Sequence, residues 1–204
     1  MDKNAFKIEL PNSIGNKITF KVENSPTRHG KIIDFVTRSE GNTVSVVGYK
    51  VKCKNSSTRI VYFDEVIKKI LFVGLSDKVG CMPLQSGTIS GDLVDRIIAG
   101  INGECHKINL VNFAPLDENG KLRYPTKSEM DIGYRHLQEL IKELNPDICV
   151  LLGNKVSKYL SNKVTSLSIQ HPSYISVYRR KSIDEYINDS INLVNSAIHP
   201  ADIS

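Results

Sequence analysis

The chain has 204 residues, of which 40% are hydrophobic, and it carries a formal net charge of +5. This length suits one domain with a sizeable core, or a main domain with a smaller one. No apolar run approaches the ~20 residues of a membrane span, and the N-terminus does not have the pattern of a signal peptide, so we expect a cytoplasmic protein with no membrane partner.

Cysteine usage predicts free thiols and no metal site. Cys53, Cys81, Cys105 and Cys149 lie 24 or more residues apart, and no two of them have C-x-x-C spacing. Zinc sites and iron–sulfur clusters usually draw ligands from such pairs. We therefore expect no metal and no cofactor.

Residues 1–66 alternate apolar and polar side chains in five short runs separated by clusters of Gly, Pro, Asn and Ser. Period-two runs of this kind predict antiparallel strands. We expect a small all-β domain at 1–66, similar to an SH3-like barrel, that docks on a protein or nucleic-acid partner. It holds 11 Lys/Arg against 7 Asp/Glu, so its net charge of +4 is most of the net charge of +5 of the chain.

Residues 67–204 change to alternating strands and helices. The pattern predicts a three-layer α/β/α domain around a mostly parallel four-stranded sheet. Thr126 and Glu129 have capping-box spacing at the start of one helix. The expected strands lie near 70–75, 107–113, 148–152 and 166–170, and the expected helices at 91–101, 126–145, 154–162 and 182–198.

Ligands of such sheets bind at the carboxyl ends of the strands. This rule selects the loops 74–91, 112–125, 153–155 and 170–181.

These loops carry a series of motifs in a familiar order. "GLSDKVGCMPLQSGTISGD" follows the first strand, "NFAPL" the second, and "HPSY" the last, with "LNPDICVLLGNKVSKYL" between them. The series resembles the uracil-DNA glycosylase superfamily over roughly residues 68–197. Its first two motifs are similar to the single-strand-selective monofunctional branch, and the "PTKSEM" helix and "DICVLLG" strand to the thermostable bacterial branch.

The resemblance implies a protein that flips a base out of DNA and hydrolyses its bond to the sugar. It makes His171 the hydrogen-bond donor to the departing base and Asn112 the reader of the base edge. Asn109 is the competing candidate, because the thermostable branch places its asparagine three residues earlier. The two lie on opposite faces of a strand, so only one can be right.

The first loop departs from the pattern of the family. The proline is missing, and Ser76 stands where an Asp, Asn or Glu normally holds the attacking water. Asp77 is one residue further along and could replace it. The resemblance also assigns Gly74 to base binding, and it places Ser90 where an aromatic ring normally stacks on the base.

The cluster-binding cysteines of the thermostable branch would fall near Phe113 and Gly133, which again predicts no iron–sulfur cluster.

The stretch "QHPSYISVYRRK" at 170–181 combines tyrosines with three consecutive cations. Cations interleaved with flat rings suit a nucleic-acid backbone. We expect Pro172 and Ser173 to grip the DNA backbone and Tyr174 or Ile175 to fill the gap left by the flipped base. Arg179, Arg180 and Lys181 would hold phosphates. A solvated turn before a helix is the alternative.

Two functions stay open. Either the protein is a monofunctional DNA glycosylase for uracil or another modified base, or it is an inactive member that binds nucleic acid or acts as an inhibitor. A mononucleotide-binding domain unrelated to DNA is a third possibility.

Overall fold

The computed structural model describes residues 14, 16–20, 28–40, 43–62, 66–178 and 182–198. The chain divides into two compact units, Met1–Ile67 and Lys68–Ser204, and each is described on its own. Within the described residues, no helix is long and apolar enough to cross a bilayer.

The first unit contains an antiparallel sheet in the order β1-β2-β3-β4. The strands are β1 (Lys17–Phe20), β2 (Arg28–Glu40), β3 (Thr43–Cys53) and β4 (Thr58–Tyr62). Phe20, Ile32, Tyr49 and Val51 are among the buried residues of its core. The first of the five short runs, at residues 5–10, lies outside the described residues, and the SH3-like barrel stays a prediction.

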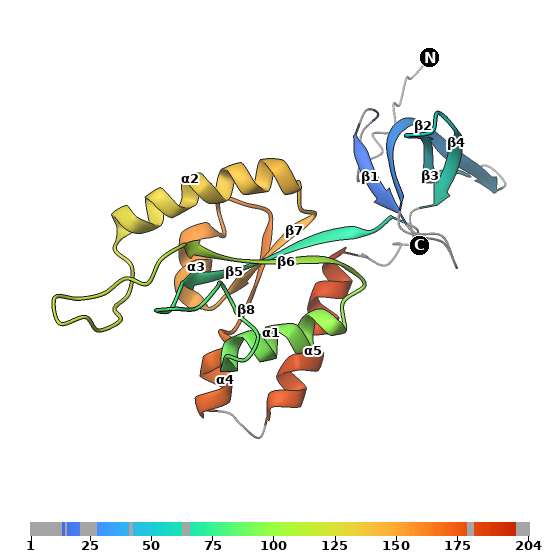
Figure 1. Ribbon diagram of the computed structural model, residues 1–204. Coiled ribbons are helices and arrows are strands. Elements are labelled where there is room, and N and C mark those ends of the chain that lie inside the picture. Colours follow the sequence, from blue (N-terminus) through green and yellow to red (C-terminus); the bar gives the residue numbers. More distant parts are fainter. Residues whose placement is uncertain are drawn as a thin grey trace, which may run out of the picture. The chain divides into compact units, whose positions relative to one another are not determined.

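The second unit is built on a parallel sheet in the order β6-β5-β7-β8. Helices cover both faces of this sheet, as Figure 1 shows. The prediction of an α/β fold with a parallel four-stranded sheet is confirmed. The strands are β5 (Lys68–Ser76), β6 (Gly103–Val111), β7 (Ile148–Leu152) and β8 (Ser166–Ile169). The helices are α2 (Lys127–Leu144) and α3 (Asn154–Leu160) on the first face, and α1 (Ile89–Ala99), α4 (Pro172–Tyr178) and α5 (Ile183–Ile198) on the second.

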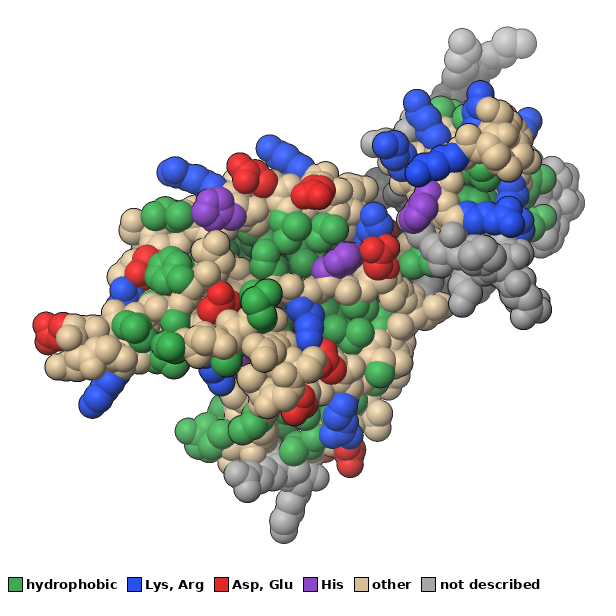
Figure 2. Space-filling view, viewed as in Figure 1, with side chains coloured by type: hydrophobic (Ala, Val, Ile, Leu, Met, Phe, Trp, Pro, Cys, Tyr) green, Lys and Arg blue, Asp and Glu red, His purple; other side chains and the backbone are tan. Residues whose placement is uncertain are grey.

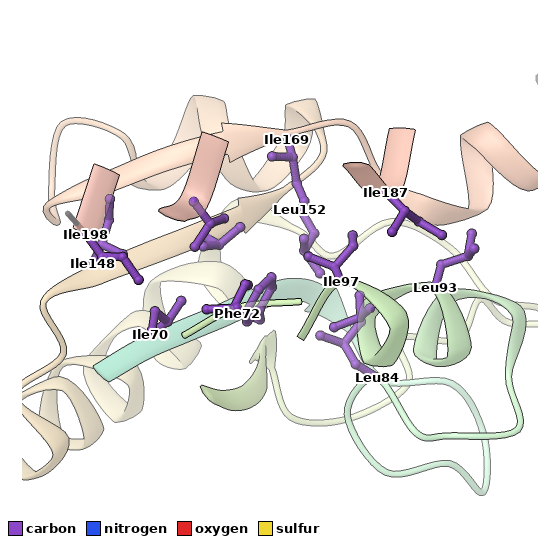
Figure 3. Close-up of a cluster of buried hydrophobic side chains, with 14 residues drawn as sticks. Ile70, Phe72, Leu84, Leu93, Ile97, Ile148, Leu152, Ile169, Ile187 and Ile198 are labelled. Carbon is purple, nitrogen blue, oxygen red and sulfur yellow. The ribbon is translucent and has the colours of Figure 1, made fainter. Parts of the chain in front are cut away.

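Alternation along the central strand builds the two halves of the core. Ile70 and Phe72 of β5 pack with α1 and α5 (Figure 3), whereas Leu71 and Val73 pack with α2 and α3. Successive side chains of a strand point to opposite faces, so a strand covered on both sides must be apolar throughout. This explains the continuous apolar run of β5 and fixes the register that positions its carboxyl end.

Two differences from the sequence expectation affect the site. β6 ends at Val111 rather than near 113, because its partner β5 ends at Ser76, which pairs with Val111. Residues 172–178 form helix α4 rather than an open loop. Proline suits the first position of a helix, and the inward-facing Ile175 gives α4 an apolar contact.

Helix α2 begins at a complete capping box, as expected. The Thr126 side chain accepts a hydrogen bond from the Glu129 N–H, and the Glu129 carboxylate accepts one from the Thr126 N–H at 2.7 Å. Arg123 also donates to both Glu129 oxygens at 2.8 Å, and these bonds lower the pKa of Glu129 to about 2. The cap thus joins α2 to residues 123–126.

Replacing Thr126 by alanine removes one side of this box. We expect the free energy of unfolding to fall by about 1 kcal/mol, the usual effect of losing an N-cap. Urea unfolding followed by helical circular dichroism measures the change. Thr126→Ser keeps the hydroxyl and is the control; equal losses in both variants would contradict the capping role.

Candidate functional site

A cavity of about 330 Å³ lies at the carboxyl ends of β5 and β6. Three of the four predicted loops contribute to it, those after β5, β6 and β8, as the strand-end rule requires. Its lining residues are Leu75, Ser76, Asp77, Lys78, Cys81, Met82, Leu84, Gln85, Thr88, Ser90, Asn109, Leu122, Arg123, Tyr124 and His171.

Asn109 is held in the wall of this cavity by its neighbours. It lies on β6, only 6% exposed, and its Nδ2 donates to Asp77 Oδ1 at 2.8 Å. Gly74 is the residue of the adjacent strand β5 that pairs with Asn109, and a Cβ at Gly74 would stand 2.0 Å from Asn109 Oδ1. Gly74 therefore contributes the space that the asparagine side chain occupies, and it does not itself line the cavity.

The expectation that Asn112 lies in the cleft is wrong. Asn112 follows the end of β6, is exposed, and does not line the cavity. Asn109 takes that place, so the choice between the two asparagines is reversed. The physical reason is the earlier end of β6, which leaves Asn112 beyond the sheet.

The His171 ring is oriented by Ser173. Its Nδ1 accepts a hydrogen bond from the Ser173 N–H at 3.2 Å and lies 2.7 Å from Ser173 Oγ. Because a backbone N–H can only donate, Nδ1 is the acceptor, and the neutral ring carries its proton on Nε2. Gly153 lies against this ring at a positive φ of 90°, and a Cβ there would stand 2.8 Å from the His171 Cβ.

Burial favours the neutral form of this histidine. Desolvation lowers the pKa of His171, and the positive charge of Lys78 lowers it further. The cavity is thus lined by a neutral imidazole with an Nε2–H donor, an amide, and the Asp77 carboxylate.

Comparison with known proteins identifies the family of the chain. The family model of the uracil DNA glycosylase superfamily matches residues 57–194. The chain belongs to the uracil DNA glycosylase superfamily.

Among solved structures, the crystal structure of wild-type SMUG2 from Pedobacter heparinus is similar to this chain. The identity is 16%, the TM-score is 0.46, and the match covers 69% of this chain and 80% of that one. No curated protein matches the chain.

This superfamily member has a polar wall where the resemblance would put an aromatic ring. Ser90 lies in the first turn of α1 and is 5% exposed. Ser90 lines the cavity, but its Oγ is buried from solvent and has no hydrogen-bond partner among the described residues. A serine at this position provides no stacking surface for a base.

Sequence reasoning missed Tyr124, an aromatic side chain that lines the cavity. Tyr124 is 67% exposed, and Lys155 lies 4.3 Å from its ring centroid. Leu122 and Arg123 precede it, and the Arg123–Glu129 ion pair holds this segment at the start of α2. The capping box in the sequence predicted that α2 begins just after residues 122–124. Nothing in the sequence indicated that these residues turn back over the carboxyl end of β5.

Residues 172–175 were predicted to contact DNA from a loop, but in helix α4 several of them face the protein. Pro172 is buried and Ser173 bonds His171, so their side chains support the histidine. Ile175 is 3% exposed and packs inward, so it cannot enter a base stack. Tyr174 is exposed, with its ring 5.1 Å from that of Tyr178. Arg179, Arg180 and Lys181 lie outside the described residues.

The described part of this superfamily member contains no group of three His, Cys, Asp or Glu residues that could hold a metal ion.

Proposed function

We propose that this superfamily member is a monofunctional DNA glycosylase that hydrolyses the N-glycosidic bond of uracil or another modified base. One observation carries the proposal: a neutral His171, with Nδ1 occupied by Ser173, shares a cavity with the hydrogen-bonded pair Asn109 and Asp77. Those three side chains match the three tasks of the reaction.

The first task is to stabilise the departing base. Breaking the bond to the sugar leaves negative charge on a base oxygen, which the Nε2–H of His171 is suited to bond. A neutral imidazole suits a weakly basic oxygen because it can donate a hydrogen bond to that oxygen without transferring its proton. The lowered pKa of His171 keeps the ring in this form.

The second task is to recognise the base edge. One Nδ2 hydrogen of Asn109 bonds Asp77, and the other, together with Oδ1, can pair with a pyrimidine edge.

The third task is to activate water. With Oδ1 of Asp77 bonded to Asn109, Oδ2 can hold a water and oppose the positive charge that develops on the sugar. Ser76 lines the cavity beside it and can orient the same water, but it carries no charge. Asp77 thus takes the role that the first loop would otherwise lack.

The uncharged Ser76 favours one alternative, an inactive member that binds nucleic acid. In either case we propose DNA as the partner, with residues 1–66 adding a cationic docking surface through their 11 Lys/Arg against 7 Asp/Glu.

A base-release assay separates the two. Oligonucleotides carrying uracil or other modified bases are incubated with the protein, and abasic sites are cleaved and counted. We expect release from at least one of them, and Asp77→Ala should lower its rate by about 10²-fold or more, the usual contribution of a positioned acid–base group. Asp189→Ala, an exposed carboxylate on α5, is the control.

Release from none of the substrates, together with salt-dependent DNA binding, would contradict the enzyme and support the binding protein. Tight mononucleotide binding without DNA binding would contradict both.

A further inference from the structure

A second cavity, of about 440 Å³, adjoins the one that holds His171. The two share four lining residues, which all belong to the loop after β5: Asp77, Lys78, Cys81 and Met82. The other walls of the second cavity come from Val79 and Gly80 of the same loop and from Phe113, Ala114 and Leu116 after β6.

The walls of the second cavity expose large apolar side chains to water. Val79 is 64% exposed, Met82 72%, and Phe113 43%. Hydrophobic side chains are visible at the surface over the loop after β6 in Figure 2. A cluster of this kind, rimmed by charge and adjoining a binding site, indicates an interaction surface.

Hydrogen bonds within the protein hold the segments on either side of the wall formed by residues 113–116. Asp117 accepts hydrogen bonds on its carboxylate from the N–H groups of Asn119 and Lys121, and its own N–H donates to the Lys121 carbonyl at 2.8 Å. An antiparallel bridge joins Leu116 to Leu122. The Asp77 N–H donates to the Val111 carbonyl, which ties the loop after β5 to the end of β6.

We propose that the second cavity binds the unstacked base of the nucleotide next to the one whose base is excised, in single-stranded DNA. This inference rests on the proposed function for the identity of the first cavity. Because the cavities share four residues, consecutive nucleotides of one strand can place a base in each. Phe113 supplies the aromatic face on which a base of any sequence can stack.

Lys78 provides the charge that this arrangement requires. It is exposed and lines both cavities, so it stands where the phosphate joining the two nucleotides must pass. Asp77 lines both cavities as well, but its carboxylate is bonded to Asn109. Mostly apolar walls with one cation suit a nucleotide and do not suit a partner that binds through charge alone.

A duplex would have difficulty filling both cavities. The neighbour of a flipped base is still paired and stacked in a duplex, so moving it into its own cavity would require a second unstacking. A single strand has no pairing to lose. The second cavity therefore favours single-stranded substrates.

The test uses the full chain and single-stranded oligonucleotides with a tetrahydrofuran abasic analogue at the centre. One oligonucleotide carries bases on both neighbouring nucleotides, and the other has abasic analogues there as well. Fluorescence anisotropy gives both dissociation constants. Phe113→Ala should weaken binding of the base-bearing oligonucleotide roughly 5- to 150-fold, the range for loss of one base–aromatic stack, and hardly affect the other.

Matched variants make the result specific. Phe113→Tyr keeps the ring and should bind like the parent, and Ile132→Ala removes an exposed apolar side chain from α2 and should change nothing. Equal effects of Phe113→Ala on both oligonucleotides, or no effect on either, would overturn the inference. So would a change in sedimentation that follows Phe113→Ala, since it would identify a second copy of the chain as the occupant.

The proposed function can fail separately. If Phe113→Ala acts as expected but uracil and other modified bases are never released, the second cavity stands as part of a binding protein. If base release occurs but the neighbouring bases do not affect binding, the proposed glycosylase function is supported and the second cavity does not bind a base.

Discussion

Replacing His171 by alanine is expected to lower the rate of base release by about 10²–10³-fold, the usual effect of losing one pre-positioned donor to developing negative charge. DNA binding should change little, because the donor acts mainly when the bond to the base breaks. Single-turnover kinetics on the best substrate measure the first effect, and anisotropy measures the second.

Ser173→Ala distinguishes this role from a structural one. It removes the hydroxyl beside Nδ1 but keeps the backbone N–H that bonds the same atom, so the ring should keep its tautomer and lose less activity. If His171→Ala and Ser173→Ala both abolish DNA binding, His171 maintains the fold of the loop and is not the donor.

The pH dependence of base release provides a further readout of His171. The lowered pKa keeps the ring neutral to pH values below the ordinary histidine value of 6.5, so activity should fall only in more acidic solution. Lys78→Gln removes a charge that lowers this pKa, so the fall should then begin at a higher pH. An unchanged profile in Lys78→Gln would contradict the charge effect.

Replacing Gly74 by alanine should also lower base release strongly, although Gly74 does not line the cavity. The new Cβ would stand 2.0 Å from Asn109 Oδ1, which no structure tolerates. β5 is a central strand, paired with β6 and β7, so its backbone cannot yield. Asn109 must move instead, and its bond to Asp77 breaks. We expect a loss of about 10²-fold or more, as for removal of a positioned amide.

A double-mutant cycle checks this mechanism. In Asn109→Ala the obstructing amide is absent, so adding Gly74→Ala should cost little more, and the two losses should not add. Full additivity would mean that Gly74 acts through something other than Asn109. Circular dichroism and the midpoint of urea unfolding verify that the variants are folded.

Sequence alone determined the parts of this protein that depend on local patterns. Period-two runs predicted strands in the first 66 residues, and apolar runs alternating with amphipathic helices predicted the parallel sheet. The Thr126–Glu129 spacing predicted the start of α2, and the order of four motifs predicted the superfamily. The strand-end rule selected the loops that contain His171 and Asp77, and the resemblance to the superfamily suggested their roles.

Tertiary structure alone decided which side chains meet. Val111 and Phe113 continue the apolar alternation of β6 in the sequence, but β6 ends at Val111, where its partner β5 ends. This pairing places Asn109 in the cavity and Asn112 outside it. Likewise, Ile175 faces inward only because α4 packs on the core, and Tyr124 lines the cavity only because its loop turns back toward β5. Local propensities depend on residues that are close in the sequence, whereas strand ends and cavity walls depend on contacts between residues far apart in the chain.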